Sequence, residues 1–146
     1  MAKPCLVVSA RYHFGDSPGI FQDATYVGHQ LVLPVRKVWL DERTDQVAFY
    51  FSTTDVETLG DWRGHRVTIN GTEIGRIKNH GHTAGDADTT KLDVTLDVLH
   101  KLLGQKDNFS LAIELEKRPA TPGLSDDFVL TRFATSANFA VALGWR

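Results

Sequence analysis

The sequence predicts an all-β protein, an antiparallel β-sandwich of jelly-roll type with one short helical turn near residues 97–103. Asn70-Gly71, set between two runs of β-favouring residues, is typical of a β-hairpin, because this dipeptide accepts the two positive φ angles of a type I′ turn. Residues 92–96 and 109–115 alternate apolar and polar side chains with a period of two, which is the pattern of strands that bury one face.

The length and composition of the chain predict its domain organisation. The 146 residues include 42% apolar residues spread along the whole length, which is enough for one hydrophobic core. No segment separates two regions of different composition. We therefore expect a single domain over residues 1–146.

The first half of the chain predicts strands separated by polar loops. Alternation indicates a strand over 5–13, and turn-forming residues indicate an irregular segment over 15–29. Apolar residues alternate again over 31–40, where Pro34 lacks an N–H group and therefore indicates an edge strand or a bulge. A polar turn then leads into 46–52, which is rich in β-favouring side chains. We expect these last two strands to pair as a hairpin.

The Asn-Gly turn predicts a second hairpin. A two-residue loop pairs residues 66–69 with 72–77 and sets Val67 opposite Ile74. Gly75 in the returning strand indicates a bulge or a close approach of another part of the chain.

The rest of the second half predicts a loop, a helical turn and two strands. Residues 79–90 are polar and rich in glycine, which predicts a long exposed loop of the kind that is often functional. After the strand over 92–96, Asp97 is suited to cap a helical turn and Gly104 to end it. The strand over 109–115 follows, and residues 128–135 predict the closing strand.

Charge and hydropathy exclude several classes of protein. The net charge of −2 arises from 16 basic and 18 acidic residues that are spread along the chain, so nucleic acid is not an expected partner. No run approaches the roughly 20 apolar residues that span a bilayer, and the first residues do not resemble a signal peptide. Cys5 is the one cysteine, so no internal disulfide forms. We expect a cytoplasmic protein with no membrane insertion.

Three segments of the second half carry a resemblance: the Asn-Gly hairpin, the strand with the following turn and glycine, and the strand after it (Ile69–Gly75, Leu92–Gly104 and Asn108–Ile113). Together they resemble galactose-binding-like jelly-roll domains. The chain departs from the family pattern in the three residues between Gly104 and Asn108. The resemblance implies a sandwich whose loops at one end bind carbohydrates, in some members with a structural calcium ion.

Motifs for catalysis are missing from the sequence. The nucleophile elbow, the zinc-protease motif, the phosphate-binding loop and the dinucleotide fingerprint are all absent. His80 and His82 with Asp86 or Asp88 could supply three ligands to a transition metal. Calcium would instead take oxygen ligands, either Asp86, Asp88 and Thr89 or the first-loop pair Asp16 and Asp23. No cofactor is required by the sequence, and a polar loop without metal is the simpler interpretation.

The candidate binding residues are Asp61, Trp62, Arg63, His80 and His82. Trp62 lies in a polar connection between charged neighbours, so its ring is a candidate platform for a sugar. Tyr12 or Tyr26 is an alternative platform. The first hypothesis is therefore a non-catalytic, lectin-like module that binds a carbohydrate or a similar polar ligand. The alternatives are an assembly subunit that forms homo-oligomers through its sheets, and a small metal-dependent enzyme that uses His80 and His82.

Overall fold

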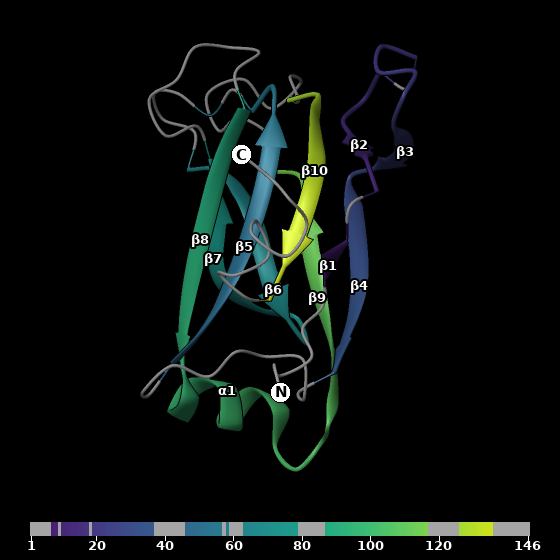
Figure 1. The fold of residues 1–146 in the computed structure, drawn as a ribbon. Helices are drawn as coiled ribbons and strands as arrows, with labels where there is room; N and C mark the ends of the chain where they lie inside the picture. Colours follow the sequence, from purple (N-terminus) through teal and green to yellow (C-terminus); the bar gives the residue numbers. More distant parts are fainter. Residues whose placement is uncertain are drawn as a thin grey trace.

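Two β-sheets face each other across a hydrophobic core, and one helix closes an end of the sandwich in the part of the chain that the structure describes (Figure 1). The structure is a computed structural model and describes residues 7–8, 10–17, 19–36, 46–56, 58, 63–78, 87–116 and 126–135. Nearly all strand pairs are antiparallel, so the predicted all-β sandwich with one short helix is confirmed.

The first sheet has the order β3-β2-β10-β5-β8, with β1 pairing on β10 as well. Its strands are β1 (Val7–Val8), β2 (Tyr12–Phe14), β3 (Thr25–Gly28), β5 (Gln46–Thr54), β8 (Ala87–Thr95) and β10 (Phe128–Ala134). The second sheet has the order β4-β9-β6-β7. It contains β4 (Gln30–Arg36), β6 (His65–Ile69), β7 (Thr72–Ile77) and β9 (Asn108–Glu114). The helix α1 (Leu96–Leu103) joins β8 to β9 across one end, and no helix of the described residues is long and apolar enough to span a membrane.

Large apolar side chains from both sheets fill the space between them. Phe49, Phe51 and Phe133 of the first sheet are fully buried, and the Phe49 ring meets Phe109 of the second sheet edge-to-face, with 6.3 Å between the ring centres. The alternation predicted over 109–115 is confirmed, because Phe109, Leu111 and Ile113 of this stretch point into the core. Burial of this apolar surface is the main term that stabilises the sandwich.

The hairpin predicted between residues 31–40 and 46–52 is wrong. β4 pairs with β9 in the second sheet, whereas β5 pairs with β8 and β10 in the first. Alternation shows that each strand buries one face, but it carries no information on which strand lies beside it. The edge position predicted from Pro34 is confirmed, since β4 ends the second sheet among the described strands.

Two predictions near the N-terminus also need correction. The strand expected over 5–13 is divided into β1 and β2, which pair with different parts of β10. The irregular segment expected over 15–29 contains β3, which runs parallel to β2. Thr25 N–H donates to the Arg11 carbonyl at 2.9 Å, and Gly15 N–H donates to the Gly28 carbonyl at 2.9 Å. The residues of this segment favour turns, and β3 forms because it pairs with β2 rather than because of its local propensity, so the sequence did not predict it.

The hairpin at Asn70-Gly71 is confirmed, with φ angles of 50° and 88° at the two turn residues. Its register differs from the prediction: Val67 lies opposite Gly75, because Ile74 is the extra residue of a bulge. Gly75 also has the close approach that the sequence indicated. A Cβ atom there would lie 2.7 Å from Leu92 Cδ2.

β8 and α1 each begin earlier than predicted. The first residues of β8, from Ala87, were expected to belong to the loop 79–90, but they pair in register with the end of β5. The helix is capped by Thr95 rather than Asp97, since Thr95 Oγ1 accepts a hydrogen bond from Val98 N at 3.2 Å. Asp97 lies in the first turn instead. Gly104 ends the helix with a positive φ of 61°, as predicted.

Candidate functional site

Most of the predicted site lies outside the described residues. This applies to Asp61, Trp62, His80, His82 and Asp86. Asp88 is placed by its backbone only, in β8 opposite Thr53. The metal site predicted from these side chains therefore stays a prediction, and within the described residues no group of three or more His, Cys, Asp and Glu side chains is placed to hold a metal ion.

The alternative first-loop residues contact protein partners. Asp16 bonds to His29, and Asp23 lies 3.1 Å from Arg11 Nε. The Tyr26 hydroxyl donates to the Gly15 carbonyl at 2.6 Å, while the ring meets the His13 ring at 66°. Tyr26 keeps 40% of its surface exposed, but its hydroxyl already bonds to Gly15 and its ring already contacts His13.

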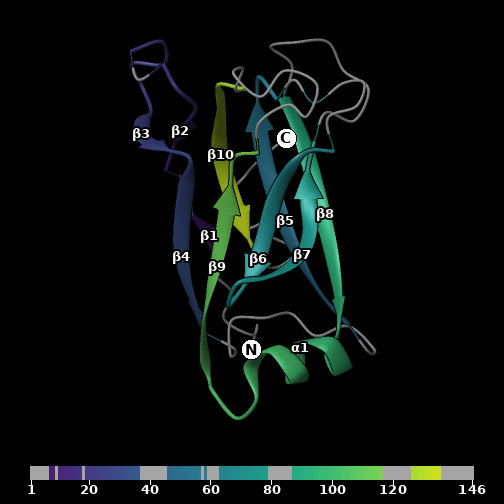
Figure 2. The ribbon, with the colours of Figure 1, turned by 180° about the vertical axis from the view of Figure 1, so that it is seen from behind.

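Arg63 belongs to a charged cluster at the end of the sandwich opposite α1. Arg63 Nη2 lies 3.6 Å from Glu116 Oε1, and Arg76 contacts the same carboxylate. Arg76 Nη1 also donates to the Gly64 carbonyl at 2.9 Å. The cluster gathers where β6 begins and where β7 and β9 end (Figure 2). Arg63 directly follows Trp62 in the chain and is the one described member of the predicted binding residues. The structure therefore places this member of the predicted site at the end opposite α1.

A buried His-Asp pair lies beneath this charged cluster. His65 Nδ1 accepts a hydrogen bond from Glu116 N at 3.1 Å, so Nε2 carries the proton and donates it to Asp126 Oδ2 at 2.9 Å. The imidazole stacks on the Phe128 ring, with 4.5 Å between the ring centres, and is fully buried. Both ring nitrogens of His65 bond to protein groups and neither reaches solvent. The His65–Asp126 pair therefore has a structural role rather than a catalytic one.

A second buried pair lies beside the first. His13 Nε2 is 2.9 Å from Asp127 Oδ1, which also accepts a hydrogen bond from Ser17 N at 3.1 Å. His13 is fully buried and its ring edge meets Phe21. Since Asp127 directly follows Asp126, two adjacent carboxylates bind one histidine from each sheet. The His65–Asp126 pair therefore connects the two sheets at the end opposite α1, whereas the His13–Asp127 pair links β2 to the start of β10 within the first sheet.

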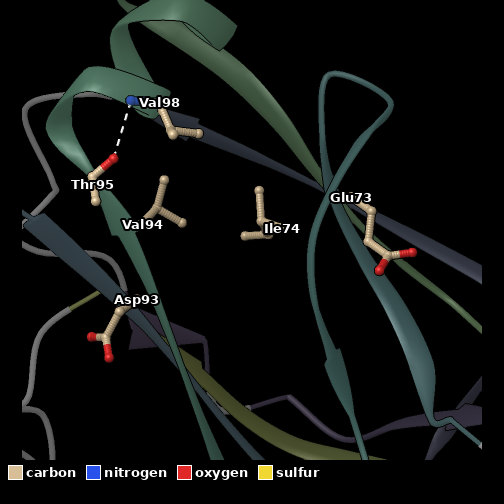
Figure 3. Close-up of a pocket in the computed structure, with 6 residues that line it drawn as sticks. All are labelled: Glu73, Ile74, Asp93, Val94, Thr95 and Val98. Atoms are coloured by element: carbon tan, nitrogen blue, oxygen red, sulfur yellow. Dashed lines mark hydrogen bonds between the residues drawn. The ribbon is translucent and has the colours of Figure 1, made fainter.

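A pocket of about 260 Å³ lies on the flank of the sandwich (Figure 3). We call it the flank pocket; it is lined by Glu73 and Ile74 of β7, by Asp93, Val94 and Thr95 of β8, and by Val98 of α1. β7 and β8 are the last described strands of their sheets on this side, so the pocket forms where the two edges come together. In Figure 3 the side chains of Ile74, Val94 and Val98 surround the central space, whereas the carboxylate groups of Glu73 and Asp93 lie at its outer margins and point away from it.

The two carboxylates of the flank pocket already have cationic neighbours. Glu73 lies 2.9 Å from Arg76 and 3.4 Å from Arg66. Asp93 lies 3.5 Å from Lys91 Nζ and accepts a hydrogen bond from Gln46 at 3.4 Å. The negative charge is therefore compensated, and the pocket is an apolar surface with carboxylate acceptors at its margins rather than a cation site.

Sequence reasoning missed the flank pocket. Its residues belong to two strands and a helix, and ordinary alternation explains each of them separately. Gly75 was the one indication, because a glycine in a strand marks a place where another segment comes close. The structure identifies that segment as β8, with Leu92 against Gly75.

No protein-family model matches the chain, and no curated protein or solved structure matches it either. The resemblance of residues 69–113 to galactose-binding-like domains therefore stays a prediction. Function has to be inferred from the geometry of the described residues.

Proposed function

We propose that this protein is a non-catalytic, lectin-like module that binds a carbohydrate or a similar hydroxyl-rich ligand. The flank pocket carries the proposal. It combines the aliphatic surface of Ile74, Val94 and Val98 with two charge-compensated carboxylates, and this is the combination that a sugar ring uses. Sugars present apolar CH patches together with hydroxyl groups, so they need both kinds of contact.

The charge balance favours a neutral ligand over a cation. A cation in the pocket would have to compete with Arg66 and Arg76 for Glu73, and with Lys91 for Asp93. A hydroxyl group can donate to a carboxylate oxygen while that ion pair persists, because each oxygen accepts more than one hydrogen bond. The pocket therefore selects hydroxyl donors.

The size and lining of the pocket imply a weak interaction with a small ligand. A volume of about 260 Å³ fits one or two sugar rings rather than a long chain. Since the described lining residues include no aromatic platform, we expect a Kd on the order of 1 mM, which corresponds to about −4 kcal/mol. Loops at the end that carries Arg63 are the second place where such a ligand would bind, through the predicted contacts with Trp62, His80 and His82.

The two fully buried histidines are not placed to act as a general acid or base. Among the described histidines that pair with a carboxylate, His13 and His65 are fully enclosed, whereas His29 beside Asp16 is exposed. A general acid or base has to come within hydrogen-bond distance of the substrate. Neither His13 nor His65 meets this requirement.

The proposal is tested by titrating isotope-labelled protein with a panel of monosaccharides and disaccharides and following amide chemical shifts. We expect at least one sugar to shift amides of β7, β8 and α1. Val98→Lys fills the pocket from a position that is already 43% exposed and should weaken binding about tenfold, or 1.4 kcal/mol. Val32→Lys is the matched control, because Val32 is 50% exposed on β4, far from the pocket lining.

Two results would contradict the flank pocket as the binding site. The first is that no sugar of the panel shifts any amide. The second is that a sugar binds but Val98→Lys and Val32→Lys leave its affinity equally unchanged. Shifts confined to residues near Arg63 would move the site to the loops at the other end.

A further inference from the structure

We propose that Asn70 is a deamidation site, that its contacts with β9 and α1 slow the reaction in the folded chain, and that the product loosens α1. This inference goes beyond ligand binding and concerns the turn between β6 and β7. Asn70 is the one asparagine of the sequence that precedes a glycine. Both Asn70 and Gly71 are exposed to solvent at the tip of this hairpin.

The reaction needs only the chain and water. The backbone nitrogen of Gly71 attacks the side-chain carbonyl carbon of Asn70, and the Gly71 N–H proton leaves with the amide group as ammonia. Water then opens the resulting succinimide ring at either of its carbonyls, which leaves an aspartate or an isoaspartate at position 70. Glycine favours the attack because no side chain shields its nitrogen.

Hydrogen bonds to β9 and α1 hold Asn70 in the folded chain. Its backbone N–H donates to the Ser110 carbonyl at 3.0 Å, and its side-chain Oδ1 accepts from Ser110 N–H at 3.1 Å. The side-chain Nδ2 donates to the Leu102 carbonyl at 3.3 Å. Both polar atoms of the amide are therefore bonded to backbone groups of other elements, Ser110 in β9 and Leu102 in α1.

These side-chain bonds oppose the reaction. Nδ2 is the leaving group, so its bond to Leu102 has to break, and the carbonyl that Ser110 N–H holds has to become free to meet Gly71 N. Each bond contributes modestly to stability, and two of them lower the population of the open form by about tenfold or more. The rate of deamidation in the folded chain therefore depends on how often the turn separates from α1.

The products cannot restore the contact with α1. An aspartate keeps an acceptor for Ser110 N–H, but it places an oxygen where Nδ2 faced the Leu102 carbonyl, so two acceptors oppose each other. An isoaspartate adds a methylene group to the main chain and no longer fits the tight turn with φ angles of 50° and 88°. Since Leu102 lies in the last turn of α1, either product loosens that end of the helix.

This change also reaches the flank pocket. Asn70 precedes β7, which supplies Ile74 to the pocket, and Leu102 belongs to α1, which supplies Val98. The Asn70 side chain therefore links two walls of the pocket, and its conversion weakens that link. The chemistry at Asn70 needs no ligand, so the modification and the proposed function are tested separately.

The test incubates the full chain at mildly alkaline pH and follows each asparagine by peptide mapping and mass spectrometry. We expect Asn70 to convert in the folded chain, at least about tenfold more slowly than in urea, because both side-chain bonds have to open first. Asn108 is the internal control. It is also exposed, but it precedes the bulky Phe109 and should stay unconverted.

Two variants separate the opening of α1 from unfolding of the whole chain. Thr95→Ala removes the cap of α1 and should speed the conversion of Asn70 in the folded chain up to about fivefold. Val129→Ala removes buried methyl groups from β10 at the end opposite α1, so it should leave this rate unchanged.

A third variant tests the effect of the product. Asn70→Asp carries the aspartate product from the start. Hydrogen exchange of the amides in the last turn of α1 should be several-fold faster in Asn70→Asp than in the unmodified chain, because two acceptors then face each other at the Leu102 carbonyl.

Equal rates of conversion in the folded and the unfolded chain would overturn the inference, and so would an Asn108 that converts as fast as Asn70. It would also be overturned if Asn70 stays unconverted in the folded chain with and without Thr95→Ala. Equal effects of Thr95→Ala and Val129→Ala, or an Asn70→Asp variant whose helix exchanges at the unmodified rate, would contradict the link to α1. A sugar titration that still shifts the pocket amides would leave the proposed function in place in each case.

Discussion

Two glycines that flank β6 both have a positive φ but have different surroundings. Gly64 and Gly71 have φ angles of +101° and +88°, which side-chain-bearing residues rarely adopt. A Cβ atom on Gly64 would lie 2.7 Å from the Ile77 carbonyl oxygen, whereas one on Gly71 would meet nothing within 4 Å. Gly64 is therefore required both by its positive φ and by the close packing of the chain against Ile77 of β7. Gly71 is required by its positive φ alone.

This difference predicts unequal costs for the same substitution. Gly71→Ala should lower the free energy of unfolding by about 1 kcal/mol through its positive φ alone. Gly64→Ala should lower the free energy of unfolding by roughly 3 kcal/mol. The new Cβ atom would clash with the Ile77 carbonyl oxygen, which belongs to the backbone and cannot rotate away, and this clash adds to the strain of the positive φ. Urea unfolding of both variants measures the difference. Equal losses would mean that the approach of Ile77 does not constrain Gly64.

At the scale of elements, α1 depends on its contacts with the rest of the molecule. A helix of eight residues is too short to be stable alone. Leu99 and Leu103 are buried against the core, and Thr95 caps the first turn. Since α1 closes one end of the sandwich and supplies Val98 to the flank pocket, the position of this helix affects both the core and the candidate site.

The cap predicts a ranking of three variants. Thr95→Ala should lower the free energy of unfolding by about 1 kcal/mol, because Val98 N loses its acceptor. Thr95→Ser keeps the hydroxyl and should retain most of the stability. Asp97→Ala loses only an interaction with the helix dipole and should cost less than Thr95→Ala. Thermal unfolding compares them, and a larger loss for Asp97→Ala would identify Asp97 as the true cap.

At the scale of the whole molecule, aromatic side chains join the two sheets. Phe133 lies 5.1 Å from Phe51 and 6.3 Å from Phe49, ring centre to ring centre, and Phe49 in turn meets Phe109 of the opposite sheet. The His65–Asp126 pair connects the sheets near one end. A core shared in this way predicts that both sheets unfold together.

Phe133→Ala tests this cooperativity. The variant should lose about 3–5 kcal/mol of stability through the lost burial and the remaining cavity. Far-UV circular dichroism and tryptophan fluorescence should shift to the same lower midpoint, because a single domain has a single transition. Val32→Ala, at a half-exposed position, should change stability by less than about 0.5 kcal/mol. Two separate transitions would contradict the single-domain prediction.

Several elements were predictable because their cause is local. The Asn70-Gly71 turn follows from the backbone preferences of two residues, and the strand with Phe109, Leu111 and Ile113 follows from alternation within one segment. β3 and the first residues of β8 were missed because their order depends on β2 and β5, which are distant in sequence. Of the candidate binding residues, Arg63 is the one that the structure describes, and its link to Glu116 depends on the pairing of β6 with β9, which the sequence does not reveal.

By itself the sequence determined that the protein is an all-β sandwich with one short helix, since period-two burial and turn chemistry are properties of short segments. Only the tertiary structure decided which strands are neighbours, that β4 and β5 lie in different sheets, and that β7 and β8 meet to form the flank pocket. The physical reason is that a strand pattern specifies which face is buried, whereas the backbone hydrogen bonds that choose a neighbour are the same for every strand.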